Sequence, residues 1–213
     1  MATYAPSRIA RARNLQGIYV ILNEERRVLQ LARRVLDAGV RLVQYRAKAG
    51  IVAENLEALR ALTRGRDALL ILNDDWRCAQ RFDCDGVHLG PDDDGFDRVA
   101  VVREAMGERL IGLSCGSIEE VLAANVSDAD YLGVGSVYVT PSKDDAGAPI
   151  GTQALHRLAA ASTLPVAAVG GISAANIAEI RDSQVAMAAV VSAISDSTDP
   201  YRAARELVEA WQR

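Results

Sequence analysis

The sequence predicts a (β/α)8 barrel of the TIM type, in which parallel strands alternate with helices. Short apolar runs recur along the chain, and each ends in a compact polar cluster. Stretches with apolar residues at helical spacing lie between these runs. If every run is a parallel strand, all the polar clusters lie at one end of one sheet. Barrels of this class build their active sites at that end, so the pattern predicts the place of function together with the fold.

The apolar runs are the predicted strands. An example is Leu69-Leu70-Ile71-Leu72, which leads into Asn73-Asp74. Eight such units in 213 residues fit the small end of the size range of these barrels. An open, doubly wound sheet shows the same alternation of strands and helices, and it remains the rival fold at this point. The strands are expected near residues 17–22, 41–45, 68–73, 86–89, 109–114, 130–135, 165–169 and 185–191.

Helices are predicted where apolar residues recur every three or four positions. Three of them show this spacing clearly. Their apolar positions are Val28, Leu31, Ala32, Val35 and Leu36 in the first, Leu56, Leu59, Ala61 and Leu62 in the second, and Ala203, Ala204, Leu207, Val208 and Trp211 in the last.

Residues suited to helix ends support these assignments. Gly39 follows the first helix in the position of a C-terminal glycine. Ser173 is expected to cap a helix at 174–181, and Asp199-Pro200 to start the last helix. The segment 1–16 is expected to hold a short leading helix. Since no linker or low-complexity tract interrupts the pattern, residues 1–213 are predicted to form one domain.

Charge and composition exclude some classes of partner. The net charge of −4 is mild and gives no reason to expect nucleic acid or an anionic membrane. No apolar run approaches the ~20 residues that a membrane-spanning helix needs. Cys78, Cys84 and Cys115 share no metal-binding spacing and are expected to be reduced thiols. We expect a cytoplasmic protein that acts on small molecules; its oligomeric state, a homo-oligomer included, stays open.

Two carboxylates are the candidate metal ligands. Asp74 and Asp93 each follow a predicted strand, on neighbouring βα loops. Mg²⁺ typically takes one or two protein carboxylates and fills its other positions with water and substrate phosphates. The pair, with Asn73 beside it, therefore favours a Mg²⁺ site. The alternative is that Asp74 or Asp75 caps the next helix and that Asp92 to Asp94 form a solvated loop. This run of aspartates leaves the register of the second ligand open.

Basic residues after the second strand predict a polyphosphate site. Arg46 and Lys48 are two positions apart, so at strand spacing they point to the same side. Arg offers a fork of donors, and Lys offers a point charge. Gln44 has the same parity and is suited to hydrogen-bond a heterocycle. Ordinary surface charge at a strand end is the alternative.

Two later segments are also suited to phosphate. Thr140, Ser142 and Lys143 lie in a polar stretch that is either a phosphate-binding loop or a plain turn. Gly170-Gly171 follows the seventh strand, where glycines let backbone N–H groups approach a phosphate. Val191-Ser192 supplies the eighth-strand half of such a site. A tight turn explains the glycine pair equally well.

Neither histidine is predicted to carry acid–base chemistry. His88 lies inside an apolar run, where a packed, hydrogen-bonded side chain is expected, and His156 falls on the exposed side of a predicted helix. No dinucleotide-binding fingerprint or P-loop motif occurs in the sequence. The chemistry is therefore expected to need no His or Cys nucleophile.

Taken in order, these clusters resemble the thiamine phosphate synthase family over roughly residues 17–207. Each motif is weak by itself, and the shared order makes the resemblance specific. The matching motifs are the family's Q-x-R-x-K at 44–48, N-D at 73–74, G-V-H-L-G-x-x-D at 86–93, G-x-S at 112–114, D-Y-x-x-x-G at 130–135, T-x-[TS]-K at 140–143, G-G-I at 170–172 and V-S-A-I at 191–194.

The resemblance implies a transferase that joins 4-amino-2-methyl-5-pyrimidinylmethyl diphosphate to thiazole phosphate, or to its carboxylate, and releases pyrophosphate. In the family the C–O bond to pyrophosphate is thought to break first, which leaves a pyrimidinylmethyl cation. Carried over by position, the resemblance implies Mg²⁺ on Asp74 and Asp93. It also implies catalytic roles for Arg46, Lys48, Lys143 and Ser114. It assigns the diphosphate to Arg46, Lys48, Asn73 and Lys143, the pyrimidine to Gln44 and Ser114, and the thiazole phosphate to Thr140, Ser142, Gly171, Val191 and Ser192.

Two departures from the family pattern bear on the site. Ala47 stands where an acid is usual, and Gly116 replaces a common histidine after Ser114-Cys115. Three alternatives remain: the related thiazole tautomerase, another phosphate-binding barrel isomerase or lyase, and a non-catalytic barrel that binds a thiamine precursor. The aspartate pair favours the transferase over the first two. Mg²⁺-dependent turnover separates an enzyme from the third.

Overall fold

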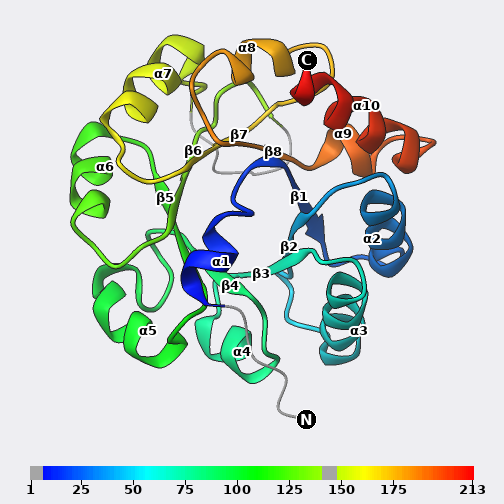
Figure 1. Ribbon diagram of the computed structural model, residues 1–213, viewed down its shortest axis with the longest axis horizontal. Coiled ribbons are helices and arrows are strands. Elements are labelled where there is room, and N and C mark those ends of the chain that lie inside the picture. Colours follow the sequence, from blue (N-terminus) through cyan, green and yellow to red (C-terminus); the bar gives the residue numbers. More distant parts are fainter. Residues whose placement is uncertain (1–6, 141–147) are drawn as a thin grey trace.

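The computed structural model describes residues 7–140 and 148–213 of the chain. In this part of the chain eight strands form one closed sheet, every neighbouring pair is parallel, and β8 returns to β1 (Figure 1). The closure confirms the predicted barrel and excludes the open sheet. The strands are β1 (Gly17–Asn23), β2 (Leu42–Arg46), β3 (Leu69–Asn73), β4 (Gly86–Leu89), β5 (Leu110–Cys115), β6 (Tyr131–Val134), β7 (Val166–Val169) and β8 (Met187–Val190).

A ring of helices covers the outside of the barrel (Figure 1). The apolar face predicted for the first of them is confirmed, because all its predicted positions are buried in α2. In α3 the face is shifted: Ala61 is exposed, and Thr63 is buried in its place. The helices are α1 (Arg8–Ala12), α2 (Val28–Asp37), α3 (Ala53–Arg64), α4 (Trp76–Arg81), α5 (Val99–Met106), α6 (Ile118–Asn125), α7 (Gly151–Ala161), α8 (Ile177–Arg181), α9 (Ser192–Ser195) and α10 (Pro200–Gln212), with a 3-10 turn η1 (Phe96–Arg98) before α5.

The predicted helix start after β7 is wrong. The helix α8 begins at Ile177 and not at residue 174. The backbone N–H of Ser173 donates to the side chain of Asn176 at 2.9 Å, and the N–H of Asn176 donates back to the Ser173 carbonyl at 3.2 Å. These bonds form a turn that takes the place of the first helical turn. By contrast, Asp199 caps α10 as predicted, since its side chain accepts from the N–H of Arg202.

The leading helix α1 lies across the end of the barrel at which the strands begin (Figure 1). Arg8 Nε lies 2.5 Å from Asp130 Oδ1, and Arg11 Nε lies 3.3 Å from Asp85 Oδ1. Asp130 directly precedes β6, and Asp85 directly precedes β4. Both carboxylates are buried, and the two ion pairs hold α1 to the barrel. The helix leaves the opposite end of the barrel free for the candidate site.

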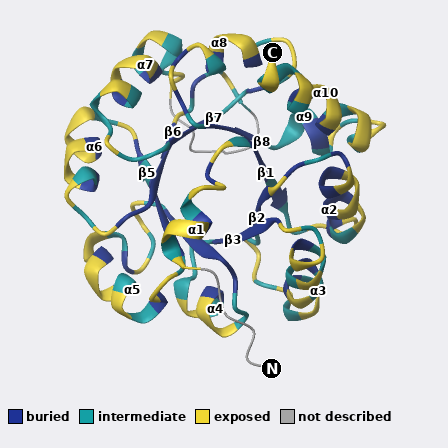
Figure 2. Ribbon diagram, viewed as in Figure 1, coloured by how far each residue is buried: buried dark blue, intermediate teal, exposed yellow. Residues whose placement is uncertain are grey.

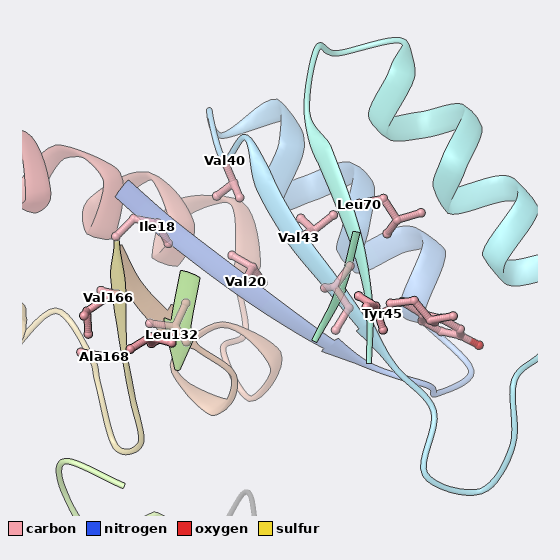
Figure 3. Packing of buried hydrophobic residues seen from close by; sticks show 14 of the residues in the cluster. Ile18, Val20, Val40, Val43, Tyr45, Leu70, Leu132, Val166 and Ala168 are labelled. Carbon is pink, nitrogen blue, oxygen red and sulfur yellow. The ribbon is translucent and has the colours of Figure 1, made fainter. Parts of the chain in front are cut away.

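The main core lies between the strands and the helices. Figure 2 shows buried strands inside a ring of helices that are exposed on their outer sides. Ile18 and Val20 of β1, Val43 and Tyr45 of β2, and Leu70 of β3 belong to this core (Figure 3). Because strand residues alternate in direction, the intervening residues face the barrel interior. A second apolar cluster fills the interior and includes Tyr19, Leu42, Ile71, Leu110, Tyr131 and Met187.

The described helices include none that is both long and apolar enough to cross a membrane.

Candidate active site

A cavity of about 450 Å³ opens where the barrel strands end. Residues from all eight strands, or from the loops just after them, form its walls. All the candidate site residues within the described part of the chain line this one cavity, whereas Ser142 and Lys143 lie outside the described residues. The candidates that line it are Gln44, Arg46, Lys48, Asn73, Asp74, Asp93, Ser114, Thr140, Gly170, Gly171, Val191 and Ser192.

Strand β2 sends its polar residues into this cavity. Alternate residues of this strand face the barrel interior, namely Leu42, Gln44 and Arg46. Leu42 belongs to the interior apolar cluster, and the other two line the cavity nearer the end of the strand. Arg46 Nη1 donates to Asn23 Oδ1 at 3.1 Å, which fixes the guanidinium beside the end of β1. Ala47, in place of the usual acid, packs against the outer core. The missing acid therefore changes the outer side of the strand end and not the cavity wall.

The carboxylates of Asp74 and Asp93 interact directly. Burial raises the pKa of Asp93, and the hydrogen-bonding contact with Asp74 raises it further, although the Gly90 N–H donates to Asp93 Oδ2 at 2.6 Å. Lys48 Nζ lies 2.8 Å from Asp74 Oδ2. The site thus holds two carboxylates and one ammonium group before any ligand enters.

The neighbouring aspartates have other surroundings. Asp75 caps α4, because its side chain accepts from the Cys78 N–H at 2.9 Å. Asp94 pairs with Arg77 and Arg98, and these partners lower its pKa. Asp94 is also outside the cavity lining, so of the three consecutive aspartates it is excluded as the second ligand.

The aspartate pair fits a divalent cation. Two carboxylates in contact repel each other when both are ionised, and a cation between them relieves that repulsion. Within residues 7–140 and 148–213, no group of three or more His, Cys, Asp and Glu side chains gathers into a metal site. Two carboxylates match the one or two protein ligands that Mg²⁺ typically takes when water and phosphate oxygens fill its other positions.

A glycine corner follows β7. Gly171 has a φ of +65°, a left-handed conformation that favours glycine. A Cβ at Gly171 would lie 2.6 Å from the Val139 carbonyl oxygen and 2.7 Å from Tyr138 Cβ, so the segment before Thr140 packs directly on this backbone. Val191 lies beside this corner in the cavity lining. At Gly170 and Gly171 the backbone itself therefore lines the cavity, with no side chain in front of it.

His88 lines the cavity, and this place was not predicted from the sequence. His88 is packed and hydrogen-bonded as expected: Nδ1 lies 3.2 Å from Tyr131 Oη, and Nε2 lies 3.1 Å from Ser114 Oγ. Burial lowers its pKa to about 4, so the imidazole is neutral at neutral pH. It also lines the cavity floor beside Tyr19. The sequence held one indication of it. His88 and Gly86 are two positions apart in the strand 86–89, so they face the same side, and Gly86 faces the barrel interior.

Room for this histidine comes from the next two strands. A Cβ at Gly112 would lie 2.6 Å from His88 Nδ1 and 2.2 Å from the Tyr131 ring. A Cβ at Gly133 would lie 2.9 Å from His88 Cε1. The glycines of β5 and β6 therefore let the imidazole lie against the barrel wall and reach Ser114.

A carboxylate at the cavity mouth was also missed. Glu120 lines the cavity, and its Oε2 accepts from the backbone N–H of Gly116 at 2.5 Å. Ser117 and Glu120 form a capping box at the start of α6. Gly116 also lines the cavity, and Glu120 holds its backbone amide.

The family model described as thiamine monophosphate synthase matches residues 18–194. The chain is 40% identical to thiamine-phosphate synthase of Archaeoglobus fulgidus, over 96% of this chain and 98% of that protein. It is 39% identical to thiamine-phosphate synthase of Geobacillus kaustophilus, over 91% of each. Among solved structures, thiamine phosphate pyrophosphorylase from Pyrococcus furiosus superposes with a TM-score of 0.84 at 34% identity, over 94% of this chain and 97% of that one.

Proposed function

The chain belongs to the thiamine monophosphate synthase family, and we propose that it joins 4-amino-2-methyl-5-pyrimidinylmethyl diphosphate to thiazole phosphate, or to its carboxylate. The products are thiamine phosphate and pyrophosphate, with CO2 released as well when the carboxylate is the substrate, so the enzyme is a transferase. The three cysteines form no disulfide, which supports the cytoplasmic setting that we propose for the reaction.

One observation carries this proposal. The cavity combines an aspartate pair and two cations on one side with the glycine corner on another, and it has Gln44 and Ser114 in its wall. These are the groups needed to hold a metal-bound diphosphate, a second phosphate and a heterocycle together in one place. A barrel isomerase with a single phosphate substrate has no need of the aspartate pair.

The diphosphate end of the substrate binds to charged side chains. Arg46 and Lys48 donate to its oxygens, and Lys143 takes up the charge that develops as the pyrophosphate leaves. Asn73 donates to the same group. Asp74 and Asp93 would hold Mg²⁺, which would neutralise charge on the leaving group. On binding, Lys48 exchanges its ion pair with Asp74 for contact with the diphosphate.

The reaction proceeds through departure of pyrophosphate before the new bond forms. The electron pair of the C–O bond leaves with the pyrophosphate oxygen, and the thiazole nitrogen then supplies the pair for the new C–N bond. This sequence needs no protein nucleophile. Of the described residues that line the cavity, Cys115 is the one thiol, and burial raises its pKa to about 11; His88 is the one imidazole, and it is held between Tyr131 and Ser114.

The two rings are placed by neutral groups. Gln44 and Ser114 hydrogen-bond the pyrimidine. The backbone of Gly170 and Gly171, with Val191-Ser192, holds the thiazole phosphate, and Thr140 and Ser142 add hydroxyl donors. Holding both rings in one cavity supplies the proximity that a reactive cation requires.

The direct test is an endpoint assay of the purified full chain with both substrates, with and without Mg²⁺. After phosphate removal, thiamine is detected by oxidation to fluorescent thiochrome. The proposal predicts product that requires both substrates and Mg²⁺. Absence of product from folded protein, over a range of Mg²⁺ concentrations, would contradict it.

A further inference from the structure

A chain of hydrogen bonds joins Gln44 to Ser114 through the interior of the barrel. Gln44 Nε2 donates to Tyr19 Oη at 2.7 Å, and Tyr19 Oη lies 2.9 Å from Tyr131 Oη. Tyr131 Oη lies 3.2 Å from His88 Nδ1, and His88 Nε2 lies 3.1 Å from Ser114 Oγ. Both ends of the chain line the cavity, whereas Tyr131 is fully buried below it.

The bond at Gln44 sets the direction of the others. Because Gln44 donates to Tyr19, the arrangement in which both tyrosine hydroxyl hydrogens find an acceptor runs one way. Tyr19 then donates to Tyr131, Tyr131 donates to His88 Nδ1, and His88 Nε2–H donates to Ser114. The imidazole must be neutral to accept at one nitrogen and donate at the other, and its depressed pKa meets that condition.

This direction fixes what each end offers to a ligand. One N–H of Gln44 is already bonded to Tyr19, so Gln44 Oε1 remains available to accept a hydrogen bond from a ligand. Ser114 Oγ already accepts from His88, so its own O–H is kept as a donor. For the opposite arrangement, the side-chain amide of Gln44 would have to flip, and every hydrogen bond of the chain would have to exchange its donor and acceptor.

We propose that Tyr19, Tyr131 and His88 are positioning residues that hold Gln44 as an acceptor and Ser114 as a donor, and that this polarity selects an aminopyrimidine over its oxo counterpart. The inference rests on the proposed function, which supplies the pyrimidine. An amino group donates and the adjacent ring nitrogen accepts, which matches the two ends. In the oxo form the carbonyl accepts and the ring N–H donates, so both contacts are mismatched.

The packing of the chain suits such a role. Tyr19 and Tyr131 lie edge to face with ring centroids 6.0 Å apart, and the His88 ring lies 5.5 Å from that of Tyr131. Burial raises the pKa of both tyrosines, so both keep their hydroxyl hydrogens at neutral pH. A methyl group at Gly112 would overlap both Tyr131 and His88, which leaves the rings little freedom to turn.

The test is calorimetric titration of the full chain with two probes, the 4-amino pyrimidinylmethyl diphosphate and its 4-oxo analogue. Tyr131→Phe keeps the ring but removes the central link. We expect its affinity for the amino probe to fall about tenfold and its preference for amino over oxo to fall by a similar factor. The KM for thiazole phosphate should stay within about twofold. Tyr19→Phe, which breaks the chain at a different link, should shift the preference in the same direction.

The matched control is Tyr45→Phe. Tyr45 is equally buried, but its hydroxyl bonds to Glu24 on the outer side of the barrel, so the preference should be unchanged. Circular dichroism melting identifies any variant that has lost its fold. If Tyr131→Phe and Tyr19→Phe are folded and keep the wild-type preference, or if the wild-type chain binds both probes equally, the inference is wrong. Binding preference is measured without turnover, so a wild-type chain that forms no thiamine phosphate contradicts the proposed function separately.

Discussion

The carboxylates of Asp74 and Asp93 are in hydrogen-bonding contact, although they come from loops after different strands. The contact depends on the parallel pairing of β3 with β4, which places the two strand ends side by side. Asp74 adopts a φ of 70°, an uncommon conformation that aspartate tolerates better than most residues. The turn directs the chain away from the strand at the point where the metal would bind.

Lys143→Ala should lower kcat by about 100-fold or more, because it removes a cation that we place on the departing pyrophosphate. Lys143→Arg, which keeps the charge, should retain more of the activity. Steady-state kinetics with both substrates measures the effect. Near-normal turnover of the alanine variant would show that this lysine does not stabilise the leaving group.

Gly171→Ala should raise the KM for thiazole phosphate several-fold, because the added methyl group would lie 2.6 Å from the Val139 carbonyl oxygen. Gly107→Ala is the matched control: its φ is also positive, at +56°, but nothing lies within 4 Å of the added Cβ. Both variants should lose roughly 1–3 kcal/mol of stability from the backbone conformation alone. An equal change in KM in the two variants would remove the glycine corner from the phosphate site.

Asp130→Asn should lower the free energy of unfolding by about 3 kcal/mol or more, because it removes the negative charge of a buried side chain that pairs with Arg8 and Arg103. It also disturbs the bond from the Ile111 N–H to Asp130 Oδ2, at 2.7 Å. Asp182→Asn, at an exposed ion pair, is the control and should change little. Urea denaturation compares them. Equal stabilities would mean that the ion pairs of α1 do not hold the barrel end.

The stability of the protein should fall as the pH decreases from 6.5 towards 4, partly because of His88. Its pKa in the folded protein is about 4, against an ordinary value of 6.5. In that window the unfolded chain binds more protons, so stability is highest above it and declines by up to about 1.4 kcal/mol per pH unit. His88→Gln should show a shallower decline in denaturant titrations across this range. An identical slope would mean that His88 protonates in the folded state without cost.

Much of the fold could be predicted because apolar runs and helical periods report directly on burial. The strand predictions agree with the structure to within one or two residues at most ends. The start of α8 could not be predicted, because Ser173 and Asn176 suit a turn as well as a helix cap.

The site was only partly predictable, because some of its contacts join residues that are far apart in the sequence. Polar clusters at strand ends identified the residues that meet in the cavity. The Tyr19–Tyr131 contact joins positions 112 residues apart, each a single hydroxyl inside an apolar run, so no local pattern indicates it. Asp93 could not be told from Asp94 because consecutive loop residues have no fixed spacing; their surroundings separate them only in three dimensions.

The assignment of Mg²⁺ to Asp74 and Asp93 can be tested by comparing the adjacent residues Asp93 and Asp94. Initial rates of thiamine phosphate formation are measured against Mg²⁺ concentration for the wild-type chain, Asp93→Asn and Asp94→Asn. Asp93→Asn should need at least tenfold more Mg²⁺ or lose activity. Asp94→Asn should keep the wild-type dependence, because Asp94 pairs with Arg77 and Arg98 outside the cavity. The same Mg²⁺ dependence in all three proteins would contradict this assignment.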